Sequence, residues 1–193
     1  MIAPAELTLG IIAGGAATRL HGRDKAWLRL ADEPLVQRLV RAFAGQVSST
    51  WISANRDLER YAAAGLPAVS DRVATRPGPL AGIDALLAAC PTPWLLTVPV
   101  DLLHPPPDLP ARLRAACADA AGAYARDDDG PQPLAALWRV AACRTAVAQA
   151  LAGGDYAVHR VQAGLGLVRV DFAGLRFGNL NTPEDLARHG IQS

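Results

Sequence analysis

The chain has 193 residues, of which 51% are hydrophobic and 19% are charged, and its formal net charge is +1. This length supports a hydrophobic core that buries roughly 70% of the unfolded surface, and the composition excludes an intrinsically disordered protein. A net charge near zero provides no basic surface for nucleic acid. The composition therefore favours a small-molecule partner and excludes a nucleic-acid partner.

The sequence gives no sign of a membrane segment or a secreted protein. No apolar run approaches the ~20 residues that a membrane-spanning helix requires. Residues 1–15 contain Glu6 but no lysine or arginine, so they lack the charged start of a signal peptide. Cys90, Cys117 and Cys143 are odd in number and widely spaced, which indicates neither a disulfide framework nor a zinc site. We expect a cytoplasmic protein with no membrane partner.

Apolar runs that alternate with helical patterns predict an α/β fold with three layers. Strands are predicted at residues 7–13, 50–54, 68–70, 94–98, 122–126, 134–139 and 167–171. Helices are predicted at residues 34–43, from about 58, at 79–89, 108–118, 141–151 and 156–162, and from Thr182 onwards. This alternation is typical of a mostly parallel, Rossmann-like sheet with helices on both faces. Because no repeat or linker interrupts it, we expect a single domain over residues 1–193.

In open α/β sheets, ligands bind beyond the carboxyl ends of the strands. This rule directs attention to residues 14–25, 55–56 and 71–78, and to Asp101.

The rarest polar residue types fall in or near these segments. Lys25 is the only lysine among 19 lysines and arginines, and Asn55, Asn179 and Asn181 are the only asparagines. The abundance of Ala, Arg, Gly and Pro is typical of a GC-rich genome, which tends to replace lysine with arginine. An ammonium group and a guanidinium group are not interchangeable at a phosphate site. Lys25 is therefore a candidate phosphate ligand, with random persistence as the alternative.

The segment that follows the first strand has the features of a phosphate-binding loop. It begins with Gly14-Gly15 and carries Arg19 and Lys25. Glycines let backbone N–H groups approach phosphate oxygens, and the two cations would neutralise the charge. The spacing matches neither a Walker loop nor G-x-G-x-x-G, so a nicotinamide cofactor is disfavoured. The alternative is a flexible turn with surface arginines.

Two acidic segments could serve as metal ligands. Asp101 ends a buried strand, where a carboxylate either caps a loop or binds Mg²⁺. Opposite a phosphate loop, the magnesium ligand is the favoured interpretation. Residues 127–129 form an acidic run beside Gly130 and Pro131, which predicts a solvated turn. The histidines show no H-E-x-x-H spacing and the chain has no G-x-S-x-G, which argues against a zinc enzyme and the main hydrolase class.

These segments resemble the motifs of the molybdenum cofactor guanylyltransferases, within the wider group of Rossmann-like NTP transferases. The resemblance covers nearly the whole chain. The matching segments are Ile12-Ala13-Gly14-Gly15 with Arg19 and Asp24-Lys25, then Ala54-Asn55-Arg56, Asp71 with Pro77 to Gly82, Val98-Pro99-Val100-Asp101, and Asn179 to Glu184. Leu20-His21 stands where the family usually has Met-Gly, Ala16 replaces the usual Ser or Lys, and residues 156–160 replace a more basic stretch.

The resemblance implies transfer of GMP from GTP to molybdenum-molybdopterin, with release of pyrophosphate. It implies a nucleotide-binding N-terminal half and an acceptor-binding C-terminal half. The implied nucleotide-binding residues are Ile12, Ala13, Gly14, Gly15, Arg19, Lys25, Asn55, Asp71, Gly78 and Asp101. Of these, Arg19, Lys25 and Asp101 would be catalytic, and Asp101 would also bind Mg²⁺. The backbone amides of Gly14 and Gly15 would bind the triphosphate. Asn179, Asn181 and Arg160 would bind the acceptor.

Alternatives of two classes stay open. The enzyme alternatives are a cytidylyltransferase for the same pterin and a sugar-nucleotide pyrophosphorylase, and the other alternative is a non-catalytic nucleotide-binding protein on the same fold. We expect a monomer or a weak homo-oligomer. Contacts with other cofactor-biosynthesis proteins and with acceptor molybdoenzymes are also expected.

Overall fold

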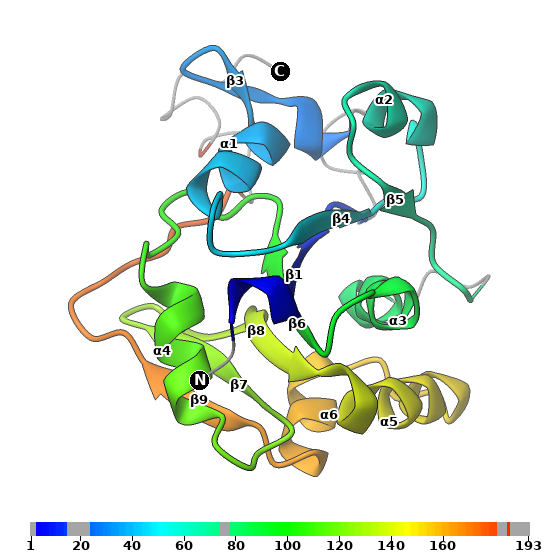
Figure 1. The fold of residues 1–193 in the computed structure, drawn as a ribbon, viewed down its shortest axis with the longest axis vertical. Coiled ribbons are helices and arrows are strands. Elements are labelled where there is room, and N and C mark those ends of the chain that lie inside the picture. The colour runs from blue at the N-terminus through cyan, green and yellow to red at the C-terminus, as the bar shows by residue number, and fades with distance from the viewer. Residues whose placement is uncertain (1–2, 15–23, 74–77, 181–184, 186–193) are drawn as a thin grey trace.

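A central sheet organises the protein, seen in a computed structural model that describes residues 3–14, 24–73, 78–180 and 185 (Figure 1). Within these residues the sheet has seven strands in the order β5-β4-β1-β6-β8-β7-β9. In chain order the strands are β1 (Leu7–Ile12), β4 (Ser49–Ser53), β5 (Ala68–Val69), β6 (Trp94–Pro99), β7 (Gly122–Asp127), β8 (Gly130–Arg139) and β9 (Val168–Asp171).

Most neighbouring strands are parallel, which confirms the predicted type of sheet. β1 pairs in parallel with β4 and β6, β4 with β5, and β7 with β9. Only β8 runs antiparallel to its neighbours β6 and β7 in the described residues. The predicted strand at residues 134–139 starts earlier, at Gly130, because Asp128 and Asp129 alone form the turn of a β7–β8 hairpin.

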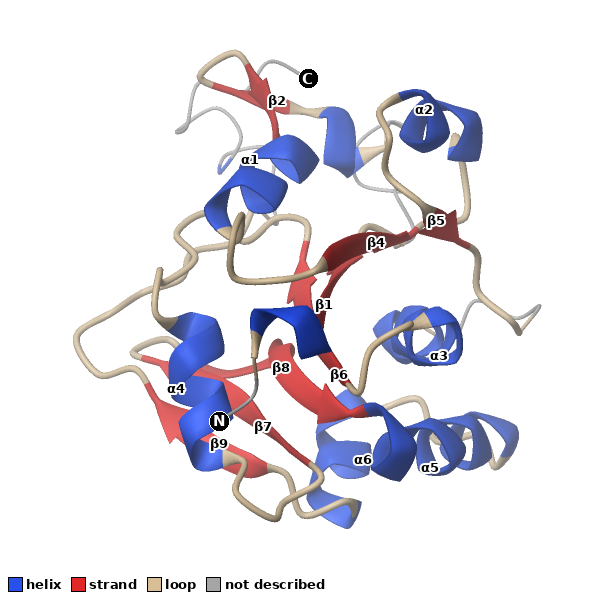
Figure 2. Ribbon diagram, in the orientation of Figure 1, coloured by secondary structure: helices blue, strands red, loops and turns tan. Residues whose placement is uncertain are grey.

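Helices cover both faces of the sheet, as predicted (Figures 1 and 2). One side carries α1 (Leu35–Ala42) and α4 (Leu109–Ala116), and the other carries α3 (Pro79–Ala89), α5 (Val140–Ala152) and α6 (Val158–Gly164). The short helix α2 (Leu58–Ala63) lies between β4 and β5 in the chain. Among the residues described here, no helix is long and apolar enough to cross a membrane.

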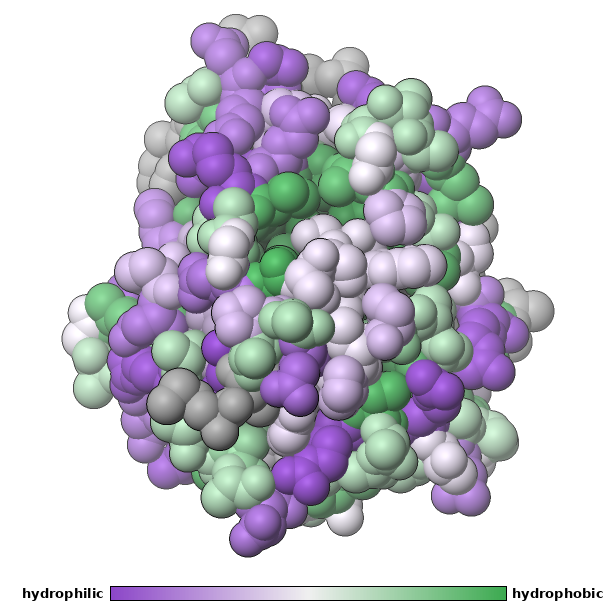
Figure 3. Space-filling model, viewed as in Figure 1, coloured by the Kyte–Doolittle hydropathy of each residue, from purple (hydrophilic) through white to green (hydrophobic). Residues whose placement is uncertain are grey.

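Alternate side chains of the strands enter two separate cores. On β8, Leu137 packs with α1 and α4 residues, whereas Ala136 and Trp138 pack with α3, α5 and α6. This alternation is the two-residue period of a strand covered on both faces. Helix α1 buries its inner stripe, and hydrophilic residues cover its outer side in Figure 3.

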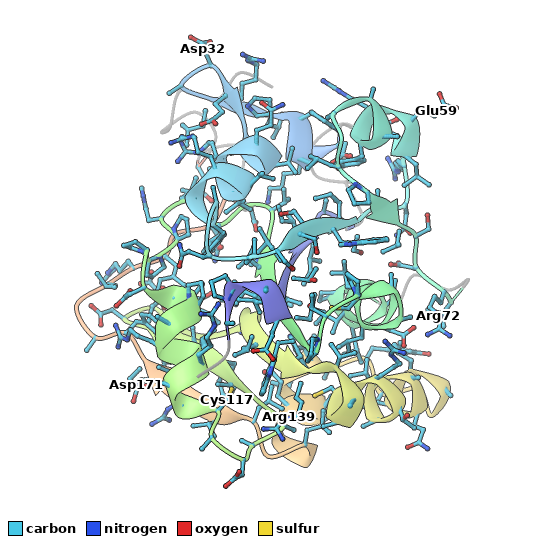
Figure 4. All side chains as sticks on the ribbon, viewed as in Figure 1. Asp32, Glu59, Arg72, Cys117, Arg139 and Asp171 are labelled. Atoms are coloured by element: carbon cyan, nitrogen blue, oxygen red, sulfur yellow. The ribbon has the colours of Figure 1, made fainter. Side chains whose placement is uncertain are left out.

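A small hairpin was not predicted. Strands β2 (Arg29–Leu30) and β3 (Glu33–Pro34) pair across Ala31 and Asp32, at the tip labelled Asp32 in Figure 4. Both turn residues have positive φ, 49° and 62°. Such a turn usually contains glycine or asparagine. Because Ala31 and Asp32 stand there instead, the sequence did not indicate a hairpin. The helix predicted from Thr182 lies outside the described residues, apart from Asp185.

Helix α3 approaches the sheet closely because a glycine lies on each side of the interface, Gly10 on β1 and Gly82 on α3. A Cβ on Gly10 of β1 would lie 2.9 Å from Leu86 and Leu95, and a Cβ on Gly82 of α3 would lie 2.4 Å from Ser53 Oγ. This approach brings the start of α3 against the carboxyl end of β4.

We predict that Gly82→Ala lowers the free energy of unfolding by about 1–3 kcal/mol, because the added methyl must displace Ser53 or the helix. Gly164→Ala is the matched control, since a Cβ on this α6 residue meets no atom within 4 Å. The control should leave the stability unchanged or raise it by up to about 1 kcal/mol. Urea denaturation measures both, and equal effects would contradict the packing argument.

Candidate active site

The carboxyl ends of four parallel strands meet at one edge of the sheet. Ile12 of β1 pairs with Ser53 of β4 and with Pro99 of β6, and Ser53 pairs with Val69 of β5. The segments that leave these strands therefore start side by side, as the sequence predicted for a ligand site. They include the predicted nucleotide-binding residues Ile12 and Ala13.

The backbone after β1 stays attached to β4. The N–H groups of Ala13 and Gly14 both donate to the carbonyl of Ser53, over 2.9 and 2.8 Å. The amide of Gly14, expected to bind phosphate, is therefore already used inside the protein. A Cβ on Gly14 would lie 3.4 Å from Asn55 Nδ2, an ordinary van der Waals distance, so packing within the protein does not require a glycine at this position.

Lys25 and Asp101 form an ion pair at this edge. Lys25 Nζ donates to Asp101 Oδ2 over 2.7 Å, although the residues are 76 positions apart in the chain. Their side chains are 21% and 15% exposed, so the pair is largely shielded from water. Charges at this distance interact more strongly when they are shielded than when they lie on the surface. The structure thus brings together the two residues that the sequence had assigned to phosphate and metal.

Lys25 owes its position to a short 3-10 helix, η3 (Lys25–Trp27). Asp24 caps this helix, and its Oδ1 accepts a hydrogen bond from the N–H of Ala26 over 3.0 Å. Arg19 and Gly15, also predicted to bind phosphate, lie outside the described residues. Their roles stay predictions.

Asn55 and Asp71 form a reciprocal pair beyond β4 and β5. Asn55 Nδ2 donates to Asp71 Oδ2 over 2.8 Å, and the N–H of Asp71 donates to Asn55 Oδ1 over 2.9 Å. The second carboxylate oxygen of Asp71 is buried without a partner in the described residues, as are Ser53 Oγ and Asp84 Oδ1. Gly78 starts α3 nearby with a φ of +86°, a conformation that favours glycine.

The segment before residue 181 returns to the same edge. The backbone of Asn179 bridges that of Leu102, and the N–H of Leu103 donates to the carbonyl of Gly178 over 3.1 Å. Asn179 therefore lies beside the residue that follows Asp101. Its Oδ1 is buried and has no partner among the described residues. Asn181 lies outside the described residues.

Comparison with known proteins identifies the family to which this chain belongs. Residues 9–166 match the sequence model of a family described as the MobA-like NTP transferase domain. The chain belongs to this family. It is a nucleotidyltransferase, and the resemblance stated from its motifs is confirmed.

Similar proteins cover nearly its whole length. The chain is 36% identical over 182 residues to a protein of Yersinia pseudotuberculosis serotype O:1b named molybdenum cofactor guanylyltransferase, covering 93% of each chain. A solved structure from Archaeoglobus fulgidus, molybdopterin-guanine dinucleotide biosynthesis protein A, has a TM-score of 0.74 at 21% identity and covers 94% of this chain and 96% of its own. A 2-C-methyl-D-erythritol 4-phosphate cytidylyltransferase from Thermus thermophilus has a TM-score of 0.69 at 19% identity, with 93% and 95% covered. The two solved structures share the fold.

The described protein oxygen atoms at the carboxyl edge of the sheet are too few to bind Mg²⁺ by themselves. A bound substrate would have to supply further oxygen ligands. In the described ranges, no group of three or more His, Cys, Asp or Glu residues could hold a metal. Asp101 offers a carboxylate, and Asn179, whose backbone bridges that of Leu102, offers a buried amide oxygen. Mg²⁺ commonly takes one or two protein ligands and completes its shell with phosphate oxygens and water.

Arg160 is the predicted acceptor residue that the structure does not bring to this group. It lies in α6, is exposed, and forms an ion pair with Asp155 at 2.6 Å. Its role in acceptor binding stays a prediction.

Asp127 corrects the prediction of a solvated turn. Its side chain is buried, and its carboxylate accepts hydrogen bonds from the N–H of Asp129, from Gln132 Nε2 and from the N–H of Phe177. The last bond is 2.8 Å long and anchors the segment that carries Asn179. A run of acidic residues beside glycine could not reveal this, because the partner lies 50 positions away.

Asp84 and Tyr61 are further residues that the sequence did not single out. Asp84 is 3% exposed on α3, and its Oδ2 lies 3.5 Å from Arg72, which Figure 4 shows near the outer edge beside α3. Burial raises the pKa of Asp84, Arg72 opposes this shift, and Asp71 adds to it. Tyr61 is fully buried on α2 and donates a hydrogen bond to Asp24. Neither residue could be recognised from the sequence, because each lies in a helix whose residue pattern is that of an ordinary helix.

We predict that Asp84 makes the folded state less stable as pH rises. A raised folded-state pKa means that the folded protein holds the proton more tightly than the unfolded chain. The unfolding free energy therefore falls as pH rises from the ordinary range of an Asp through the raised value. Asp84→Asn removes this effect, so it should stabilise the protein more at pH 7.5 than at pH 4.5.

Chemical denaturation of both proteins at the two pH values measures the difference. Asp119→Asn, at an exposed aspartate in the turn before β7, is the control and should change little at either pH. The same stability difference for Asp84→Asn at both pH values would show that the carboxyl does not titrate in this window.

Proposed function

We propose that this nucleotidyltransferase transfers GMP from GTP to molybdenum-molybdopterin, giving the molybdopterin guanine dinucleotide cofactor and pyrophosphate. The contact between Lys25 and Asp101 at the carboxyl edge of the sheet carries the proposal, since it joins the cation expected to bind phosphate to the carboxylate expected to bind the metal. The choice of substrates rests on the 36% identity to a protein named molybdenum cofactor guanylyltransferase.

The reaction needs positioning and charge neutralisation more than covalent work by the protein. A terminal phosphate oxygen of the pterin attacks the α-phosphorus of GTP, and the bond to the pyrophosphate oxygen breaks. Lys25 and Arg19 would contact the triphosphate and neutralise its charge. Before the nucleotide binds, the ion pair with Asp101 keeps Lys25 in place.

Magnesium would supply a positive charge that stabilises the leaving pyrophosphate. Asp101 and the amide oxygen of Asn179 are the residues that would hold it, together with phosphate oxygens. Asn179, Asn181 and Arg160 would contact the acceptor. The hydrogen bonds of residues 177 and 178 to the segment after Asp101 support a common location for the metal and the acceptor.

Unpaired acceptor atoms support guanine as the base. The carboxylate oxygens Asp71 Oδ1 and Asp84 Oδ1 are buried without partners in the described part of the chain. Guanine offers N1–H and N2–H groups on one edge, whereas cytosine offers only its N4–H group. A carboxylate can accept both guanine donors, and leaving such an oxygen unpaired costs about 1–3 kcal/mol.

We predict that, with magnesium present, GTP stabilises the protein selectively. A ligand at ~100 times its Kd adds about 2.7 kcal/mol to the unfolding free energy, which a melting curve resolves. The measurement is a thermal-shift series with GTP, CTP, ATP and UTP. A larger shift with CTP would indicate a cytidylyltransferase, and equal shifts with all four would contradict selective recognition of guanine.

We predict that Asp101→Ala abolishes turnover while the protein stays folded, because the change removes the carboxylate that would hold Mg²⁺ and that contacts Lys25. Lys25→Arg keeps the charge but changes its shape, and kcat/KM should fall at least ~10-fold, or about 1.4 kcal/mol. Steady-state kinetics of pyrophosphate release measures both. Asp119→Ala, on an exposed turn at the opposite edge of the sheet, is the control. Near-normal turnover by Asp101→Ala would refute the assigned role.

A further inference from the structure

Tyr61 connects helix α2 to the turn that carries Lys25. Its hydroxyl donates to Asp24 Oδ2 over 2.6 Å, and the two residues are 37 positions apart. The tyrosine side chain is fully buried. A hydrogen bond to a carboxylate in such surroundings is stronger than a bond between neutral groups.

An aromatic contact packs the Tyr61 ring against η3. The Tyr61 ring packs against Trp27, the last residue of η3, with 5.1 Å between the ring centroids. The guanidinium carbon of Arg60 lies over the Trp27 ring, 4.3 Å from its centroid. Burial, followed by the contact with Asp24, raises the pKa of Tyr61 far above its usual value, so the hydroxyl keeps its proton and remains a donor.

Both oxygens of Asp24 are used to hold the turn. Oδ2 accepts from Tyr61, and Oδ1 accepts from the N–H of Ala26, which lies in η3 directly after Lys25. The carboxylate therefore fixes the start of the 3-10 helix, and Lys25 is its first residue. From this position the Lys25 side chain reaches Asp101.

We propose that Tyr61 is a positioning residue for the reaction, which acts through Asp24 to hold the Lys25 ammonium at the phosphate site. The proposal rests on the proposed function for the role of Lys25. The physical connection from Tyr61 to Lys25 can be tested without a nucleotide.

The test uses the fact that Lys25 is the only lysine in the chain. Its rate of acylation by acetic anhydride, measured by peptide mass spectrometry, reports how tightly the ammonium is held against Asp101. Tyr61→Phe removes the hydroxyl but keeps the ring that packs on Trp27. We expect the acylation rate of Lys25 to rise at least about threefold, and kcat/KM for the nucleotide to fall about tenfold.

A matched control separates positioning from a general loss of stability. Thr97→Val removes another buried hydroxyl, which accepts from Trp138 Nε1 over 2.9 Å on the opposite face of the sheet. This variant should lower the melting temperature without changing the acylation rate of Lys25 or kcat/KM. Asp24→Asn is a second variant, which weakens the hydrogen bond between Tyr61 and residue 24 by changing the acceptor. Its effect on the acylation rate of Lys25 should not add to the effect of Tyr61→Phe.

The outcomes distinguish the two proposals. Unchanged acylation of Lys25 in both Tyr61→Phe and Asp24→Asn, or equal changes in Thr97→Val, would overturn the positioning role. Faster acylation in a protein that transfers no nucleotide would support the connection and refute the proposed function. In a Lys25→Ala background, Tyr61→Phe should have no further effect on kcat/KM, and a full additional loss would show that Tyr61 acts by another route.

Discussion

The parallel pairing of β1 with β4 on one side and β6 on the other is the constraint on which the site depends. Backbone hydrogen bonds continue past the strands, from Ala13 and Gly14 to Ser53 and from Val100 to Ile12. A shift of one residue in this register would turn every side chain to the opposite face, and both faces are buried. The positions from which the segments carrying Lys25, Asn55 and Asp101 leave the sheet are therefore fixed.

Hydrogen bonds from polar side chains hold the loops that are not part of a helix or strand. Asp24, Asp71 and Asp127 each fix a segment near the carboxyl edge of the sheet through hydrogen bonds of their carboxylates or backbone. The loops need such partners because each buried backbone donor requires an acceptor. The result is a site whose charged groups are in contact before a nucleotide binds. Catalysis by positioning requires this kind of preorganisation.

Much of the fold could be predicted because its signals are local. The helix predicted at residues 79–89 coincides with α3, and the apolar runs at 7–13 and 94–98 are β1 and β6. The β2–β3 hairpin was missed because its turn lacks the usual residues, and the start of β8 was missed because Gly130 and Pro131 were included in the predicted turn. Both errors concern short turns that connect strands adjacent in the chain.

The sequence alone determined the family and the type of sheet. It also indicated the single lysine and an aspartate at the end of a strand as the candidate catalytic residues. Strand ends of a parallel sheet share one edge, so position in the sequence was enough to place Lys25 and Asp101 in the same region. Only the tertiary structure decided that Tyr61 holds Asp24, that Asn179 lies beside the segment after Asp101, and that Asp127 is buried. These contacts join residues far apart in the chain, and the packing of helices and loops selects them without leaving a local pattern.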